Sequence, residues 1–132
     1  MSDRAQTRAV FVHGNPETSA IWGPLLAALQ LPDAVTLSPP GFGSPVVDGF
    51  GATADEYVAW LASELEKQGE PVDLVGHDWG GGHVMRIAIE RPDLLRSWAM
   101  DIAGCFAPDY VWHDLAPVSY THLVEVTVIP KT

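Results

Sequence analysis

Hydrophobic residues along the chain follow two spacings, which alternate from the N-terminus onward. Short runs of β-branched and aromatic residues predict four strands, at residues 8–12, 34–37, 71–75 and 96–103. Apolar residues three or four positions apart predict helices over about residues 20–30, between residues 53 and 69, and from about residue 80 to residue 91. Strands that alternate with helices are typical of parallel sheets. We therefore expect an α/β fold, a three-layer sandwich around a mostly parallel sheet.

Local signals define several of these boundaries. Thr53 and Glu56 have the spacing of a capping box at the start of the second helix, and Gly69 is placed to end that helix. Pro24 falls early enough in the first helix to be tolerated in its first turn. Three prolines and two glycines over residues 38–45 predict a loop after the second strand.

The composition limits the partners of the protein. Seven Lys and Arg against 17 Asp and Glu give a formal net charge of −10, which disfavours nucleic acid and anionic lipid as partners. The first residues are polar and precede only a short apolar run, so we expect a cytoplasmic protein without a signal peptide or membrane span. Cys105 is the only cysteine, and we give it no catalytic role. No glycine-rich pattern matches a nucleotide-binding motif, so we expect no cofactor.

The segment Gly76-His77-Asp78-Trp79-Gly80 lies where the third strand passes directly into the third helix. Small residues that flank a central nucleophile are the pattern of a nucleophile elbow, a sharp turn that exposes the central side chain above the sheet. Asp78 is the side chain so displayed, and Gly76 and Gly80 let the backbone turn. The alternative is an ordinary glycine-rich turn in which the aspartate caps the helix.

A second motif, His13-Gly14-Asn15-Pro16, follows the first strand. A loop in that place can approach the elbow and donate hydrogen bonds to a developing anion. With these motifs the chain resembles the α/β-hydrolase superfamily, and in particular its branch with an aspartate nucleophile, the haloalkane dehalogenases and epoxide hydrolases. The resemblance also rests on the segments Pro40-Gly-Phe-Gly43 and Arg91-Pro-Asp-Leu-Leu95, and it covers about residues 8–116.

The resemblance implies a two-step reaction on a small apolar electrophile. A carboxylate is ionised at neutral pH, so Asp78 can attack an alkyl carbon directly, displace halide or open an epoxide, and become an ester. In the family a histidine near the chain's end, held by a second carboxylate, activates the water that cleaves this ester. The backbone N–H of Trp79 and a donor from the His13 to Pro16 loop would stabilise the oxyanion.

The same resemblance assigns halide binding to two side chains. In the dehalogenases the positions of Asn15 and Trp79 direct side-chain N–H groups at the departing halide, and both residues are present here. For Asn15 an alternative stays open, a turn residue in the left-handed conformation before Pro16. His13 and Gly14 are expected to shape the loop, with His13 orienting it through hydrogen bonds.

The remaining histidines are not placed to serve as the base. The side chain of His77 is expected to point away from substrate, His83 to be packed or solvated on the third helix, and His113 to belong to a lid or loop. A metal site made by His77, Asp78 and His83 is not expected, because a helical histidine pair that binds metal needs a spacing of four residues.

The sequence departs from the family in its length and in its last residues. A complete member is about twice as long, with later strands that carry the third acid and the histidine and with a helical lid. We divide the chain into residues 1–116, the N-terminal part of the hydrolase core, and an atypical tail, residues 117–132. Two interpretations of the tail stay open, non-native sequence or an edge strand at residues 123–129.

Two functional hypotheses follow from this departure. The first is an active hydrolase with an aspartate nucleophile, and the second is a catalytically incomplete chain or a non-enzymatic binding remnant of the fold. Since the fourth strand would ordinarily be covered by later strands, we also expect self-association through its exposed edge.

Overall fold

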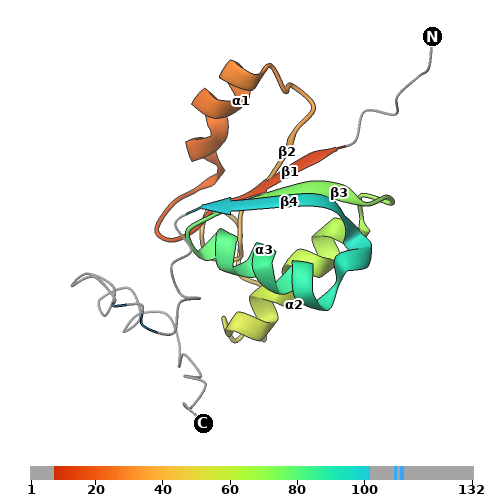
Figure 1. The fold of residues 1–132 in the computed structure, drawn as a ribbon. Coiled ribbons are helices and arrows are strands. Elements are labelled where there is room, and N and C mark those ends of the chain that lie inside the picture. The colour runs from red at the N-terminus through yellow and green to blue at the C-terminus, as the bar shows by residue number, and fades with distance from the viewer. Residues whose placement is uncertain (1–7, 102–108, 110, 112–132) are drawn as a thin grey trace.

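The structure is a computed structural model that describes residues 8–101, 109 and 111. Its centre is a four-stranded parallel sheet in the order β2-β1-β3-β4 (Figure 1). The strands are β1 (Ala9–Val12), β2 (Val35–Leu37), β3 (Val72–His77) and β4 (Leu95–Asp101). Each strand begins within a residue of its predicted start, because the β-branched runs that predicted the strands are the residues that enter the sheet.

Helices lie on both faces of this sheet. They are η1 (Ser19–Trp22), α1 (Gly23–Leu29), α2 (Ala54–Glu66), α3 (Trp79–Glu90) and the short η2 (Pro92–Leu94). Figure 1 shows α2 and α3 together on one face and α1 on the opposite face. The three-layer α/β arrangement expected from the sequence is therefore confirmed.

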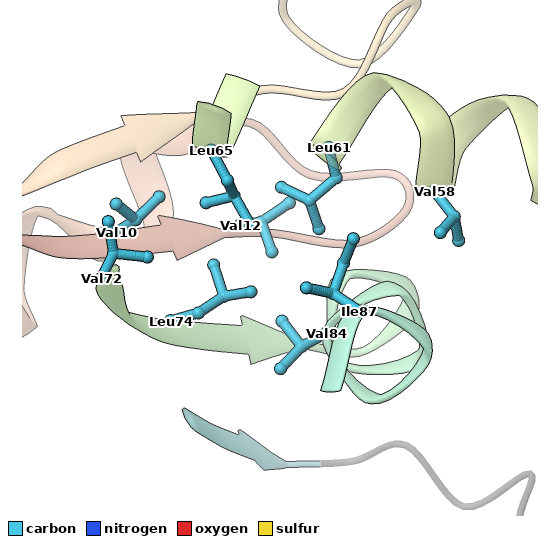
Figure 2. Packing of buried hydrophobic residues seen from close by; sticks show 9 residues of the cluster. All are labelled: Val10, Val12, Val58, Leu61, Leu65, Val72, Leu74, Val84 and Ile87. Carbon is cyan, nitrogen blue, oxygen red and sulfur yellow. The ribbon is translucent and has the colours of Figure 1, made fainter. Parts of the chain in front are cut away.

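The core lies between the sheet and the pair α2 and α3. Alternate residues of β1 and β3 point to this face, as the period of two in a strand requires, and meet the apolar stripes of the two helices. Figure 2 shows the side chains converging between these elements: Val10, Val12, Val58, Leu61, Leu65, Val72, Leu74, Val84 and Ile87. This packing fixes the start of α3 against the ends of β1 and β3.

The predicted helix over residues 20–30 is divided in two. Residues 19–22 form a 3₁₀ turn, and the α-helix begins only at Gly23, with Pro24 in its first turn as expected. Proline has no N–H to continue the bonding of the preceding turn, so a new helix starts there. The capping box of Thr53 and Glu56 is formed as predicted at the start of α2.

Two other predictions need correction or fall outside the described residues. Strand β3 runs two residues beyond its predicted end at Val75, so that His77 is still part of the sheet. Strand β4 is described only to Asp101. Ile102 and Ala103 of that predicted strand, together with Cys105, His113, His122 and the tail of residues 117–132, lie outside the described residues.

The strand order places a site at one edge of the sheet. The chain passes from β1 to β2 on one side and returns to β3 on the other, so the connections after β1 and β3 diverge. In open parallel sheets the crevice at the carboxyl ends of two such strands is where ligands bind. Both sequence motifs lie there. No helix in the described part of the chain is long and apolar enough to cross a membrane.

Candidate active site

Asp78 is the single residue between β3 and α3, and its backbone conformation is strained. Its φ of 54° and ψ of −122° lie in a region that L-residues with a side chain rarely adopt. Strain of this kind is characteristic of the turn that lifts a nucleophile above the sheet. The sharp turn that the sequence predicts between the third strand and the third helix is therefore present, at Asp78.

The flanking glycines have a different role from the one predicted. Neither Gly76 nor Gly80 has a positive φ; Asp78 itself makes the sharp turn. A methyl group on Gly80 would overlap the carbonyl oxygens of Val12 and His13, and one on Gly76 would overlap the backbone of Gly80. The two glycines therefore let the first turn of α3 approach β1 and β3 closely, which brings the elbow to the loop after β1.

The carboxylate of Asp78 faces that loop. Its Oδ2 accepts a hydrogen bond from the backbone N–H of Asn15 at 3.1 Å. A methyl group on Gly14 would overlap this carboxylate, so only glycine leaves room for it. The alternative of a helix-capping aspartate is wrong, because the Asp78 side chain makes no capping hydrogen bond to α3. The two motifs thus converge on one carboxylate, as expected.

The backbone of Asn15 excludes one alternative for this residue. The peptide bond between Asn15 and Pro16 is cis, and Asn15 is not left-handed, so the interpretation as a left-handed turn residue is wrong. Its side chain is half-buried and makes no hydrogen bond within the described part of the chain.

His13 holds the loop, as predicted. The ring is completely buried, with Nδ1 at 2.8 Å from the carbonyl oxygen of Gly14 and Nε2 at 3.0 Å from the hydroxyl of Ser38. Nδ1 must therefore donate to the carbonyl, and Nε2 accepts from the serine hydroxyl in the neutral ring. Both nitrogens are occupied in fixing the loop on the chain that follows β2.

Trp79 and His83 lie one turn apart on α3. Trp79 is half-buried, and its ring centroid is 6.5 Å from that of His83. His83 is packed rather than solvated, stacked on Tyr57 at 5.5 Å with the rings 18° apart. Burial lowers the pKa of His83 to about 4, with a smaller contribution from Arg86. His83 is therefore a neutral packing residue at physiological pH.

His77 makes contacts that sequence reasoning did not foresee. Its Nδ1 lies 2.7 Å from Oδ1 of Asp101, and its Nε2 lies 3.3 Å from Oε1 of Glu17. The sequence carried a signal for Asp101, an acid at the predicted carboxyl end of the strand beside β3. It carried none for Glu17, whose place depends on the fold of the loop.

Around Asp78 the described residues bring together a carboxylate and a backbone N–H that donates to it. No three His, Cys, Asp or Glu side chains in this part of the chain are placed to hold a metal ion together. The arrangement consists of a half-buried carboxylate, a backbone N–H that donates to it, and the half-buried side chain of the same residue, Asn15. Such a set suits nucleophilic attack with stabilisation of the anion that follows.

The comparisons with known proteins agree with this geometry. A haloalkane dehalogenase of Bradyrhizobium diazoefficiens is 32% identical over 93 residues, which are 68% of this chain and 30% of that protein. The lipase LipV of Mycobacterium tuberculosis is 38% identical over 90 residues, 65% of this chain and 33% of that protein. The chain thus spans about a third of the length of these relatives.

The fold has the same relatives in solved structures. The crystal structure of a loop variant of a haloalkane dehalogenase from Bradyrhizobium elkanii matches with a TM-score of 0.60 and 26% identity, covering 76% of this chain and 33% of the other. Residues 9–119 match the alpha/beta hydrolase family over most of the chain. This chain belongs to the alpha/beta hydrolase family.

Proposed function

We propose that Asp78 is the nucleophile of a hydrolase that acts on small apolar electrophiles such as haloalkanes or epoxides. The observation that carries the proposal is the Asp78 carboxylate, held on a strained turn with Oδ2 at 3.1 Å from the Asn15 N–H and not used to cap α3. An elbow that presents a carboxylate offers no hydroxyl for serine-type ester cleavage. The similarity to a haloalkane dehalogenase supports the choice of alkyl carbon over acyl carbon.

The first step forms a bond from an Asp78 oxygen to an sp³ carbon. The electron pair of the breaking carbon–halogen bond leaves with the halide. For an epoxide, the ring carbon–oxygen bond breaks and its oxygen takes a proton from solvent water, which leaves hydroxide. The product is an ester of Asp78. The N–H groups that the resemblance assigns to the halide come from Asn15 and Trp79, which lie on the two motifs that meet here.

The second step adds water to the carbonyl carbon of that ester and releases an alcohol and the Asp78 carboxylate. A base must take the proton from this water. Among the histidines that the structure describes, His13 is occupied at both nitrogens, His77 lies between two carboxylates, and His83 is buried in a stack. We therefore propose that the chain as given completes the first step and not the second.

The alternative is a binding-only chain that carries out neither step, so the two hypotheses differ in the first step. The chain is incubated with a 1-haloalkane, and in parallel with a terminal epoxide, and then measured by intact mass and by peptide mapping. We expect up to one adduct per chain on the peptide that contains Asp78, with halide release that stops after one equivalent. Asp78→Asn should remove the adduct, because an amide is a poor nucleophile.

A matched control is Asp33→Asn, the same change at an exposed turn after α1, which should leave adduct formation intact. Sustained release of halide or diol that survives Asp78→Asn would contradict the nucleophile. Sustained release that Asp78→Asn abolishes would support the nucleophile and show that a base acts in this chain. An unmodified Asp78 after long incubation with both substrate classes favours the binding-only alternative.

A further inference from the structure

The side chain of His77 lies on the face of the sheet opposite to the main core. Gly76 faces α3, so its neighbour in the strand points the other way, toward η1. There the ring of Trp22 meets the His77 ring edge-on, with centroids 6.3 Å apart. His77 precedes the nucleophile in the sequence, and its side chain therefore lies behind the elbow, on the face of the sheet that η1 covers.

Both ring nitrogens of His77 lie against carboxylates. His77 and Asp101 are register partners in β3 and β4, with Nδ1 and Oδ1 2.7 Å apart, and Nε2 lies 3.3 Å from Oε1 of Glu17. An ionised carboxylate only accepts hydrogen bonds, and a neutral imidazole has a single N–H to donate. The hydrogen bond to Asp101 takes one N–H, and the contact of Nε2 with Glu17 is favourable only when the ring carries both protons and a positive charge.

Glu17 carries the connection on to the nucleophile. Its second oxygen, Oε2, accepts from the backbone N–H of Gly14 at 3.2 Å, and its own N–H donates to the Gly14 carbonyl oxygen at 3.3 Å. The next N–H in the chain, that of Asn15, donates to Asp78 at 3.1 Å. The orientation of the N–H that faces the nucleophile is thus linked, through one short turn, to the ring of His77.

We propose that His77 is a positioning residue, whose imidazolium bridges Glu17 and Asp101 and holds the loop of residues 13–17 so that the Asn15 N–H stays directed at Asp78. The bridge ties the end of β4 to the loop after β1 across the back of the elbow. Its consequence for catalysis rests on the proposed function of Asp78, whereas the bridge itself does not.

The charges around the ring give the bridge a pH dependence. Burial by itself would lower the pKa of His77, but the hydrogen bond to Asp101 and the negative charges of Glu17, Asp101 and Asp78 outweigh it and raise the pKa above the ordinary value of 6.5. These three carboxylates, from the loop, β4 and the elbow, are the charged groups that face the ring in the described part of the chain. The loop should therefore be held at neutral pH and loosen as the pH rises through the raised pKa.

The test follows the amide signals of Gly14 and Asn15 in the isotope-labelled full chain by NMR between pH 5.5 and 9, together with the ring signals of His77. We expect the two amides to shift with the same midpoint as the ring, above 6.5. His77→Gln should abolish this shift and speed hydrogen exchange of the two amides about three- to fivefold, the size expected of a partly exposed charged pair.

Two further variants keep the outcome interpretable. Glu17→Gln changes one loop side chain, leaves the ring in place, and should lower the His77 midpoint and free the Gly14 amide. Asp55→Asn breaks a more exposed ion pair, between α2 and Arg86, and should leave both amides unchanged. The bridge would be overturned by a titration midpoint of His77 at or below 6.5. It would also be overturned if neither His77→Gln nor Glu17→Gln changed the amide signals of Gly14 and Asn15.

These readouts use no substrate, so the two proposals can fail separately. If Asp78 forms no adduct but the amide signals of Gly14 and Asn15 titrate with His77, the proposed function is contradicted and the bridge stands. If the adduct forms normally and the amide signals of Gly14 and Asn15 do not change with His77, the bridge is contradicted and the proposed function stands.

Discussion

Two glycines of α3 two residues apart have opposite surroundings. Gly80 packs so closely on the loop after β1 that an added methyl group would overlap the carbonyl oxygens of Val12 and His13. A methyl group added to Gly82 would meet no neighbouring atom. Because backbone oxygens cannot move aside as a flexible side chain can, the first position should reject a larger residue and the second should accept one.

We expect Gly80→Ala to lower the free energy of unfolding by about 1–3 kcal/mol. Gly82→Ala should raise it by about 0.5–1 kcal/mol, since alanine is the better helix former. Urea unfolding of the two variants, followed by circular dichroism, measures both changes. Equal effects of the two substitutions would contradict the close approach of α3 to the loop.

His83 shows how burial turns a titratable residue into a packing residue. Its ring lies between Trp79 and Tyr57, and its pKa falls to about 4. The unfolded chain takes up a proton near pH 6.5 whereas the folded chain does not, so His83 destabilises the fold progressively as the pH falls from about 6.5 toward 4.

The His83→Phe variant should lack this part of the pH dependence. Between pH 7 and pH 4.5 we expect the free energy of unfolding of the original chain to fall by about 2–3 kcal/mol more than that of the variant. Titrating carboxylates affect both proteins alike, so the difference isolates the histidine. Parallel curves for the two proteins would show that the ring is protonated inside the fold.

At the scale of single elements, α2 begins with a complete capping box. The Thr53 hydroxyl accepts from the Glu56 N–H at 3.2 Å, and the Glu56 carboxylate accepts from the Thr53 N–H at 3.0 Å. These two contacts satisfy donors that the first turn of a helix leaves without partners. The helix that carries much of the core therefore has a fixed starting point.

We expect Thr53→Ala to cost about 1 kcal/mol of stability, the typical value for loss of an N-cap side chain. Ser63→Ala is the matched control, because it removes a hydroxyl from an exposed interior position of the same helix and should be neutral or slightly stabilising. Thermal unfolding of both variants checks the pair. A Thr53→Ala protein as stable as the control would mean that the cap contributes nothing.

The elements also show where sequence reasoning succeeds and where it stops. The closeness of Asn15 and Asp78 was predictable, because motifs at the carboxyl ends of parallel strands meet at one edge of the sheet. The degree of burial of α1 was not predictable from the sequence. Its apolar spacing predicted a helix here, although not the 3₁₀ turn at its start, yet no residue of α1 is fully buried and Leu29 is 52% exposed. Periodicity identifies which face is apolar, and it contains no information about what covers that face.

The same limit explains the bridge at His77. That its side chain points away from the core face follows from strand alternation. The contacts of its two nitrogens with carboxylates have two separate origins. The register of β3 with β4 places Asp101 opposite His77, and a tight turn brings Glu17 back to Gly14. Neither contact leaves a repeating pattern in the sequence.

At the scale of the whole molecule, the sheet is unevenly covered. Strand β4 lies at its end and pairs only with β3 among the described strands, and most of its residues are exposed, including Trp98 at 48%. Parallel sheets normally bury both faces, and an open edge strand offers unpaired N–H and C=O groups to any similar strand. The described part of the chain thus presents an exposed tryptophan and a pairing edge at one place.

We expect the 132-residue chain to self-associate through β4. Ala99→Lys places a charge on the exposed edge strand and should shift the chain toward the monomer, since lysine on an edge disfavours strand pairing. Val47→Lys, an equally charged change at an exposed loop residue away from β4, should leave the association as it was. Analytical ultracentrifugation over a range of concentrations gives the comparison. A cooperative monomer that melts above about 65 °C, beyond the usual mesophile range, would count against an open edge in solution.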